Sequence, residues 1–456
     1  MNIKMNKIYE LLQLDKKDFD RASGKRVPIN FAVISSGCKL NQFEASQFEE
    51  IFKRMDMNIN IVEPDLSAAN GNGPVDLFLV NTCAVTEKAD AETNKIIRKI
   101  NKNYPGSRVI LTGCSVQLNK TKLSGLPGVK LIDNEKKTEL LKIASEKFPG
   151  AVLRQKRIRP YLKIQEGCDL NCSYCAIPIA RPSRWSLDIK SVLNSIEDFG
   201  KLGCKEVILT GVNLGAYGDA DNKKNASGLK NLLNMIEGTA NAVKIRLSSI
   251  DPVYIDDELI DIFASGKKIQ NHFHIPLQSA SDKTLGRMNR HYSFKDYAYA
   301  AAEINRKVKD AAIGTDIISG FPGETEEDFL ETVDNLEKLP IYYIHAFSYS
   351  QRPGTASYYL RQKVSEKLIK QRTGKIREIS FRKKVEFHKR FINRTLEFIS
   401  LPGNKALSSN YIKAEIAGTA PAVPPGKFFS GKLALADNAD NAGTCGGLSV
   451  MPSDYL

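Results

Sequence analysis

The chain has 456 residues, a length that suits roughly two to four domains, each burying its own core. Hydrophobic residues make up 42% and charged residues 26%, which is the composition of a globular protein, and the apolar runs are too short to span a bilayer. The 66 Lys and Arg exceed the 52 Asp and Glu, and this net charge of +14 favours a polyanionic partner such as nucleic acid.

The first residues of the chain give no sign of export. Residues 1–27 have neither the apolar core nor the small-residue cleavage site of a signal peptide. Eight cysteines without such a signal indicate a reducing compartment and metal ligation instead of disulfides. We therefore expect a cytoplasmic protein, and we assign no function to this N-terminal extension.

The next part of the chain alternates between strands and helices. Short apolar, β-branched runs at 30–37, 75–82 and 108–113 predict strands, and helical patterns at about 41–55 and 86–103 separate them. This alternation predicts a parallel, doubly wound α/β sheet, whose strand carboxyl ends share one edge.

A cysteine follows each of these three strands: Cys38, Cys83 and Cys114. Because the strand ends meet at one edge, we expect the three thiols to lie together and form a three-thiolate metal site. Three buried structural cysteines are the alternative interpretation. Their shared position relative to the strands favours the metal site.

Three more cysteines share one short loop with the spacing C-x3-C-x2-C: Cys168, Cys172 and Cys175. A structural zinc ion or a fully ligated iron–sulfur cubane needs four protein ligands, and the nearest further candidates are Cys204 and His272. Three thiolates on a [4Fe-4S] cluster would leave one iron open to a small molecule. A three-ligand zinc site is the alternative, although catalytic zinc usually recruits His.

Beyond this loop, strands and helices alternate again. The predicted strands are 161–166, 205–210, 243–248, 272–277, 312–318 and 342–348. Six βα units suit an incomplete parallel barrel, in which the loops at the carboxyl face carry the chemistry. Cys204 precedes one of these strands, so we expect it in the core.

The carboxyl-terminal part combines a basic helix with short strands. Residues 355–391 predict a long helix broken near Gly374, and residues 361–391 carry twelve Lys or Arg against three Glu. Short alternating strands begin near 394, 409 and 428. Residues 417–456 are rich in Ala, Gly, Asn and Pro, so we expect partial disorder there and no role for Cys445.

Several motifs resemble those of the radical S-adenosylmethionine (radical SAM) methylthiotransferases. They are Gly-Cys-Lys-Leu-Asn-Gln-Phe-Glu (37–44), Asn-Thr-Cys-Ala-Val-Thr (81–86), Thr-Gly-Cys (112–114) and the cysteine loop with its aromatic Tyr174. The resemblance runs from about residue 28 to about residue 415. It implies a flavodoxin-like domain (28–150) that holds an auxiliary [4Fe-4S] cluster and a radical SAM core (151–390). The short alternating strands after the basic helix resemble a TRAM domain, so we expect a TRAM-like β-barrel at 391–440 and a tail at 441–456.

The resemblance also implies cofactor and metal residues. The metal ligands would be Cys38, Cys83 and Cys114 for one cluster and Cys168, Cys172 and Cys175 for the other. Residues expected to contact S-adenosylmethionine lie at later strand ends or in the loop: Tyr174, Gly211, Asn213, Arg246, Ser248, Gln278 and Asp316. The chain departs from the family at Arg181-Pro182, where Arg-Gly is usual, and this puts the shape of that loop in doubt.

A TRAM-like barrel often binds RNA, and an exposed aromatic such as Tyr411 could stack on bases. The motif at 37–44 resembles the branch that acts on N6-threonylcarbamoyladenosine beside the tRNA anticodon. The implied reaction uses a 5′-deoxyadenosyl radical to open the C2–H bond, sulfur from the auxiliary cluster and a methyl group from a second S-adenosylmethionine. An electron donor such as flavodoxin or ferredoxin and a sulfur source are the other implied partners.

Three alternatives stay open. Within the same enzyme class, the substrate could be isopentenyladenosine in tRNA, although that branch more often carries Gln-Met-Asn after the first Gly-Cys. It could also be an aspartate of a ribosomal protein, against which the basic helix argues modestly. From a different class, the chain could be a non-catalytic iron–sulfur protein that binds RNA or carries electrons; the barrel motifs argue against this.

Overall fold

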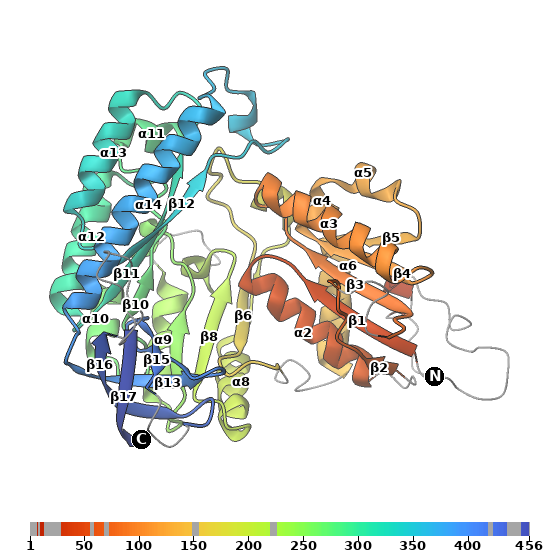
Figure 1. Ribbon diagram of the computed structural model, residues 1–456, viewed down its shortest axis with the longest axis horizontal. Helices are drawn as coiled ribbons and strands as arrows, with labels where there is room; N and C mark the ends of the chain where they lie inside the picture. The colour runs from red at the N-terminus through yellow and green to blue at the C-terminus, as the bar shows by residue number, and fades with distance from the viewer. Residues whose placement is uncertain are drawn as a thin grey trace. The chain divides into compact units, whose positions relative to one another are not determined.

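A computed structural model describes residues 7, 10–12, 29–54, 59–67, 73–147, 155–218, 226–417, 423–435 and 448–455. Cys445 and most of the N-terminal extension lie outside these ranges. The chain divides into two compact units (Figure 1). The first unit contains Met1–Lys156, Glu166–Trp185 and Ser350–Tyr358, and the second contains the rest. Both cysteine groups therefore belong to the first unit.

The first unit is built on a five-stranded parallel sheet with the order β2-β1-β3-β4-β5. Its strands are β1 (Ile29–Ser35), β2 (Ile59–Ile61), β3 (Leu77–Thr82), β4 (Arg108–Gly113) and β5 (Val129–Ile132). This is the flavodoxin-like strand order, which confirms the predicted parallel, doubly wound sheet. The edge strands β2 and β5 escaped prediction because they are short and only partly buried.

Amphipathic helices cover both faces of this sheet with their apolar sides. The helices are α2 (Lys39–Arg54), α3 (Glu87–Asn103), α4 (Cys114–Leu118), α5 (Lys120–Ser124) and α6 (Asn134–Lys147). In β3 every residue is buried: Leu77 and Leu79 pack with residues of α2 and α6, whereas Phe78 and Val80 pack with residues of α3. A strand buried on both faces reads as a continuous apolar run, which is why the sequence predicts it well.

The second unit contains six parallel strands arranged as two neighbouring sheets. They are β6 (Tyr161–Glu166, whose last residue belongs to the first unit), β8 (Glu206–Gly211), β9 (Lys244–Leu247), β10 (His272–His274), β11 (Ala312–Ser319) and β12 (Tyr343–Ser348). A bridge between Ile245 and Ile269 connects β9 to the segment before β10. All six predicted strands are present, which confirms the partial barrel. The short strand β7 (Trp185–Ser186) lies beside β6 in the sheet order.

Helices alternate with these strands: α8 (Ile189–Lys201), α9 (Ser227–Gly238), α10 (Asp257–Ser265), α11 (Asp282–Arg287), α12 (Phe294–Lys307) and α13 (Glu326–Lys338). Several begin at sequence-encoded caps. Ser293 with Asp296, and Thr325 with Asp328, form capping boxes that satisfy the first backbone N–H groups of α12 and α13. The remaining short helices are α7 (Ile177–Ala180), η3 (Leu214–Ala216), η4 (Pro252–Tyr254) and η5 (Ala356–Tyr359).

Two expectations for the carboxyl-terminal part are wrong. The helix α14 (Glu366–Lys389) runs through Gly374 without a break, because buried side chains before and after this glycine anchor it. The residues that we expected to form a tail contain β17 (Leu448–Tyr455), which closes a five-stranded barrel in the order β13-β14-β15-β17-β16. The other barrel strands are β13 (Thr395–Leu401), β14 (Lys405–Ser408), β15 (Lys413–Ile416) and β16 (Phe428–Leu435).

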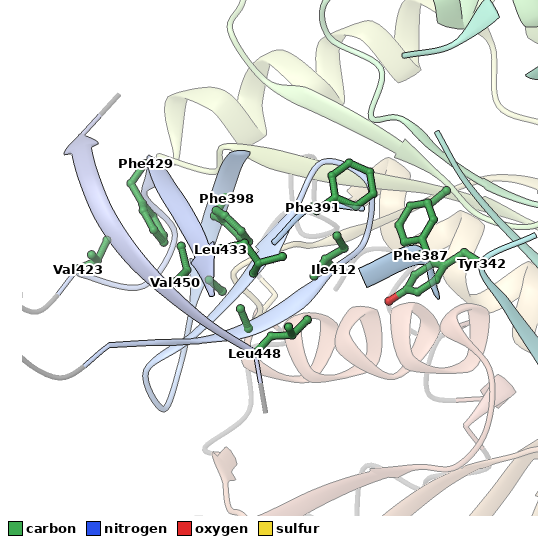
Figure 2. Close-up of a cluster of buried hydrophobic side chains, with 13 residues drawn as sticks. Tyr342, Phe387, Phe391, Phe398, Ile412, Val423, Phe429, Leu433, Leu448 and Val450 are labelled. Carbon is green, nitrogen blue, oxygen red and sulfur yellow. The ribbon is translucent and has the colours of Figure 1, made fainter. Parts of the chain in front are cut away.

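The core of the small barrel continues into the rest of the second unit. Figure 2 shows Phe387, in the last turn of α14, and Phe391, two residues beyond that helix, in one cluster with Tyr342 and the barrel side chain Ile412. The Tyr342 and Phe387 rings stack with their centroids 4.3 Å apart. One hydrophobic cluster thus spans the boundary at residue 390 that the family resemblance suggested. In the described ranges, every helix is too short or too polar to cross a membrane.

Candidate functional site

The first cysteine group lies where the strand order of the sheet reverses. Cys38 follows β1, Cys83 follows β3, and Cys114 opens α4 directly after β4. Ligands of doubly wound sheets bind outside the carboxyl ends of the strands at this reversal, which here falls between β1 and β3. Burial is the main cause that raises the pKa of Cys38 and of Cys83, and the neighbouring Cys114 adds to both shifts, so the structure brings the three thiols near one another.

The surroundings of these thiols suit an iron–sulfur cluster. Burial raises the pKa of Cys83 to about 11 and also raises that of Cys38, although Cys38 retains solvent-accessible area. The thiols therefore need a cationic metal to ionise near neutral pH. Backbone N–H groups of Val85 and Cys38 donate to the Cys83 sulfur, and the N–H of Asn41 donates to the Cys38 sulfur. Such bonds to sulfur tune the potentials of these clusters.

Glycine makes the close approach of these cysteines possible. Gly37 has φ +95°, and a Cβ built on it would lie 2.3 Å from Cys83 Cβ and 2.7 Å from Cys83 Sγ. Gly113, which precedes Cys114, has φ +98° and a Cβ position 2.3 Å from the Thr82 carbonyl oxygen. A side chain at either position would displace the strand ends that carry the thiols.

A buried ion network that we did not predict connects the segments that follow the two cysteine groups. Arg181 Nη1 donates to Glu44 Oε1 and Glu166 Oε1, both at 2.9 Å, and Nη2 donates to Asn41 Oδ1 at 2.8 Å. Lys137 Nζ donates to Glu44 Oε2 at 2.6 Å. Burial acts to lower the pKa of Arg181, but Glu44 and Glu166 raise it well above its ordinary value. Two cations and two carboxylates therefore balance each other in charge.

The same segment packs against the start of the cysteine loop. Gly167, immediately before Cys168, has φ +79°, and a Cβ there would lie 2.4 Å from the Ser183 carbonyl oxygen. Glu166 precedes this glycine, and its carboxylate accepts a hydrogen bond from Arg181. The segment with the unusual Arg-Pro sequence therefore contacts the two residues that precede Cys168.

The loop itself is a compact turn. Cys168, Cys172 and Cys175 are all half-buried, and the Cys175 N–H donates to the Cys172 carbonyl oxygen at 3.0 Å. The Ser357 N–H donates to the Ser173 carbonyl oxygen at 2.8 Å. Tyr174 is half-buried between two of the cysteines. None of the cysteines in the described ranges forms a disulfide.

In the second unit, two of the predicted cofactor residues lie at the end of β8. A Cβ on Gly211 would lie 2.9 Å from Gln165 Cβ, so glycine allows this strand end to approach β6. The Asn213 N–H donates to Gln165 Oε1 at 2.8 Å, and its side-chain amide donates to the Tyr254 hydroxyl at 3.0 Å. Two hydrogen bonds thus orient Asn213, and its side-chain oxygen can act as an acceptor.

Two further predicted residues carry signs of a binding role. Ser248 follows β9 and is buried, and in the described structure its hydroxyl has no hydrogen-bond partner. Buried polar groups normally have one, so this hydroxyl is suited to a ligand. Gln278 has φ +70°, which is uncommon for a residue with a side chain and is typical of strained functional positions.

The geometry does not support a cofactor contact by Arg246. Its Nε donates to Glu206 Oε1 at 2.9 Å, and its Nη1 donates to the Ser409 carbonyl oxygen at 2.9 Å. Glu206 is the first residue of β8, so the guanidinium points toward the amino ends of the strands. Arg246 therefore anchors the small barrel to the six-stranded barrel, and we do not retain its cofactor role.

The expected exposure of Tyr411 is wrong. Its ring stacks on His272 with centroids 4.1 Å apart, and Arg246 lies 5.3 Å from the ring centroid. Tyr411 therefore packs within the second unit and is not presented for base stacking. Cys204, expected in the core, is half-buried, and burial raises the pKa of its thiol.

Asp316 contacts two histidines that sequence reasoning missed. Its Oδ1 lies 3.0 Å from His274 Nε2 and 3.1 Å from His345 Nδ1. Burial acts to raise the pKa of Asp316, but these two imidazoles hold it well below its ordinary value. The sequence gives little indication of this contact, because His274, Asp316 and His345 are far apart along the chain.

Comparisons with known proteins agree with this geometry. The model of the Radical SAM superfamily matches residues 162–336, and that of Uncharacterized protein family UPF0004 matches residues 30–132. The chain is 34% identical to the threonylcarbamoyladenosine tRNA methylthiotransferase MtaB of Aquifex aeolicus, over 84% of this chain and 95% of that protein. It is 30% identical to the protein of the same name from Bacillus subtilis, over 89% and 94%.

Other relatives carry a different name. The chain is 30% identical to the tRNA-2-methylthio-N(6)-dimethylallyladenosine synthase of Lawsonia intracellularis, over 74% of this chain and 79% of that protein. Among solved structures, the radical S-adenosylmethionine methyltransferase TsrM of Kitasatospora setae matches with a TM-score of 0.53. That match covers 73% of this chain and 77% of TsrM at 15% identity, which shows a shared fold alone.

Proposed function

Because this chain belongs to the radical SAM methylthiotransferase family, we propose that it inserts sulfur and a methyl group at C2 of N6-threonylcarbamoyladenosine next to the tRNA anticodon. The main support for this substrate is the 34% identity to the threonylcarbamoyladenosine tRNA methylthiotransferase of Aquifex aeolicus, across 95% of that protein. The relative named for dimethylallyladenosine is matched over a smaller share of both chains.

In this proposal each cysteine group holds a different iron–sulfur cluster. Cys168, Cys172 and Cys175 would hold the cluster that binds S-adenosylmethionine, and Cys38, Cys83 and Cys114 would hold the auxiliary cluster. When bound, these groups supply the one-electron chemistry that opens the C–H bond and the sulfur that replaces the hydrogen. The protein contributes the backbone N–H groups that donate to Cys38 and Cys83, and the glycines that bring the strand ends together.

Five of the expected S-adenosylmethionine contacts remain part of the proposal: Tyr174, Gly211, Asn213, Ser248 and Gln278. The buried hydroxyl of Ser248 supports this assignment, because a ligand would satisfy its hydrogen-bonding capacity. The strained backbone of Gln278 supports it as well. Asp316 could contact S-adenosylmethionine only through its second carboxylate oxygen, because Oδ1 already accepts hydrogen bonds from two imidazoles.

The basic helix supports a tRNA substrate. The exposed cations of α14 include Lys367, Lys370 and Arg377, whose spacing places them on one side of the helix. Such a row can neutralise phosphates of an anticodon stem-loop. We further propose a cytoplasmic location, a flavodoxin or ferredoxin as electron donor, and a separate sulfur source.

Nucleoside mass spectrometry tests the substrate. A strain that lacks this gene should lose the methylthio derivative of threonylcarbamoyladenosine from its tRNA, and the wild-type gene should restore it. The Cys172→Ala variant should not restore it, because the loop then lacks one thiolate. If the derivative persists and methylthio-dimethylallyladenosine disappears instead, the other branch of the family is the correct one.

A further inference from the structure

Three side chains from three neighbouring strands meet on one face of the second unit's sheet. His274 ends β10, Asp316 lies in β11 and His345 lies in β12. His345 is paired with Asp316, and His274 is paired with Gly314, two residues before Asp316. Because strand side chains alternate between faces, this register places all three side chains on the same face.

The ligand atoms are close enough for one metal ion. His274 Nε2 and His345 Nδ1 lie 3.0 and 3.1 Å from the same oxygen of Asp316, and the potential ligand atoms all lie within 4.8 Å of one another. Bonds of about 2.0–2.2 Å to one zinc ion require ligand atoms to be separated by roughly 3 Å or slightly more. Only small side-chain movements would therefore be needed.

A second layer of contacts orients His274. The Tyr343 hydroxyl lies 3.0 Å from His274 Nδ1 and 3.0 Å from His272 Nε2. Gly314 makes room for this tyrosine, because a Cβ there would lie 2.0 Å from the Tyr343 ring. In the metal-bound form, His274 Nε2 gives up the proton that it donates to Asp316, and Nδ1–H donates to the Tyr343 hydroxyl, as the second ring nitrogen of a metal-binding histidine usually does.

The group is also reachable. The His274 side chain is 10% exposed and that of Asp316 is 20% exposed, whereas the His345 side chain is 56% exposed. An ion could therefore enter on the His345 side. Two imidazoles and one carboxylate suit a divalent transition metal such as zinc or ferrous iron, and three protein ligands leave a position open.

We propose that His274, Asp316 and His345 form a divalent metal site with its own set of ligands. Its donors are nitrogen and oxygen, whereas those of the cluster sites are sulfur. The open position would accept an oxygen donor, such as water or a carboxylate. In the metal-bound form, Asp316 is a metal ligand.

Zinc binding to the holoenzyme tests this site. Protein with both clusters assembled is incubated anaerobically with one equivalent of Zn²⁺ and desalted, after which zinc and iron are counted. The expected result is one retained zinc per chain with unchanged iron. X-ray absorption at the zinc edge should show nitrogen or oxygen neighbours at about 2.0–2.2 Å and no sulfur at about 2.3 Å.

Matched variants assign the ion to its ligands. His345→Ala, at an exposed position, should weaken zinc binding at least about 10-fold, which is the lower range seen when even supporting residues of metal sites are lost. His291→Ala, which removes a histidine outside the group, should leave zinc binding unchanged. The proposal is overturned if wild-type holoenzyme retains no zinc, if sulfur neighbours appear, or if His345→Ala binds zinc as tightly as His291→Ala does.

Discussion

Arg181 and Glu44 lie 137 positions apart in the sequence and are joined by two charge-assisted hydrogen bonds, from Nη1 to Oε1 at 2.9 Å and from Nη2 to Oε2 at 3.2 Å. Glu44 follows Cys38 by six residues, and Arg181 follows Cys175 by six residues. One buried ion pair therefore connects the segment after each cysteine group, and the bond to Glu166 extends this connection to the start of the loop.

Replacing Arg181 should destabilise the protein strongly. Arg181→Ala removes the guanidinium that bridges the buried carboxylates of Glu44 and Glu166, and breaking such a buried pair costs about 3–5 kcal/mol. Arg181→Lys keeps the charge but loses the bidentate geometry, so we expect a smaller loss. Urea unfolding monitored by circular dichroism measures both.

Arg184→Ala is the control for this prediction. Its side chain is 57% exposed and pairs with Asp169 at 3.1 Å, so its loss should change the free energy of unfolding by about 0–1 kcal/mol. If Arg181→Ala proves as mild as Arg184→Ala, the buried network does not hold these segments together.

Gly37→Ala should remove the auxiliary cluster selectively. The new Cβ would lie 2.3 Å from Cys83 Cβ at φ +95°, so Cys83 must move away from its place beside Cys38. After anaerobic reconstitution we expect iron to fall from about eight to about four per chain, because one of two four-iron clusters is lost. Iron analysis and cluster absorbance provide the measurement.

Gly106→Ala is a control that introduces backbone strain at a positive φ without a steric clash of the new Cβ. Gly106 has a similar φ of +91°, but no atom lies within 4 Å of its Cβ position. This variant should be strained without losing iron. Equal iron in Gly37→Ala and wild-type protein would contradict the close packing of Gly37 against Cys83.

Stability should fall in mildly acidic solution because of His388. Burial, assisted by Lys384, lowers the pKa of His388 from 6.5 to about 4. Between these values the unfolded chain binds a proton that the folded chain does not, so the free energy of unfolding decreases as pH falls from about 6.5 to about 4. The slope is at most about 1.4 kcal/mol per pH unit, reduced because the side chain keeps some solvent contact.

His388→Gln should remove this contribution. Urea unfolding of both proteins at several pH values between 7 and 4.5 gives the difference in slope, and other titrating groups cancel in the comparison. Parallel pH profiles for the two proteins would show that His388 does not titrate in this window. The hydrogen bond between the Tyr342 hydroxyl and His388 Nε2, 2.8 Å long, is lost or altered at every pH, so it shifts the profiles without changing their shape.

Removing the cations of α14 should weaken tRNA binding in a salt-dependent way. The triple variant Lys367→Ala, Lys370→Ala and Arg377→Ala should reduce the slope of log affinity against log salt by roughly 2–3, because each lost phosphate contact contributes about 0.7–0.9. Filter binding or fluorescence anisotropy at several salt concentrations measures the slope.

A charge-matched control uses Lys190, Lys201 and Lys267, which are exposed elsewhere in the second unit. Their replacement by alanine removes the same net charge but should leave the slope nearly unchanged. Identical slopes for the two triple variants would show that net charge alone, and not the row on α14, attracts the tRNA.

The sequence predicted best what depends on local pattern. The strands that precede Cys38, Cys83 and Cys114 are apolar and are followed by helices, so their positions and their common edge could be inferred. The six strands of the second unit were predictable for the same reason. These features need only periodicity and the rules of parallel sheets.

What depends on long-range contacts escaped prediction. The pairing of Arg181 with Glu44 and the meeting of His345 with Asp316 join segments whose proximity only the fold determines. Arg246 was correctly placed in a strand, but the sequence does not reveal that its guanidinium points to Glu206 at the amino end of β8. β17 was missed because it follows a stretch rich in small and polar residues, yet pairing with β15 and β16 stabilises it.

The hydrophobic cluster that joins Tyr342 and Phe387 to the small barrel limits how this family can be recombined (Figure 2). A chimera that takes residues 395–455 from a relative would set a foreign surface against Phe387 and Phe391. Successful grafts should therefore transfer the end of α14 together with the barrel, and should match the residue at position 342. The segment that must be exchanged as one piece is therefore longer than the five strands of the small barrel.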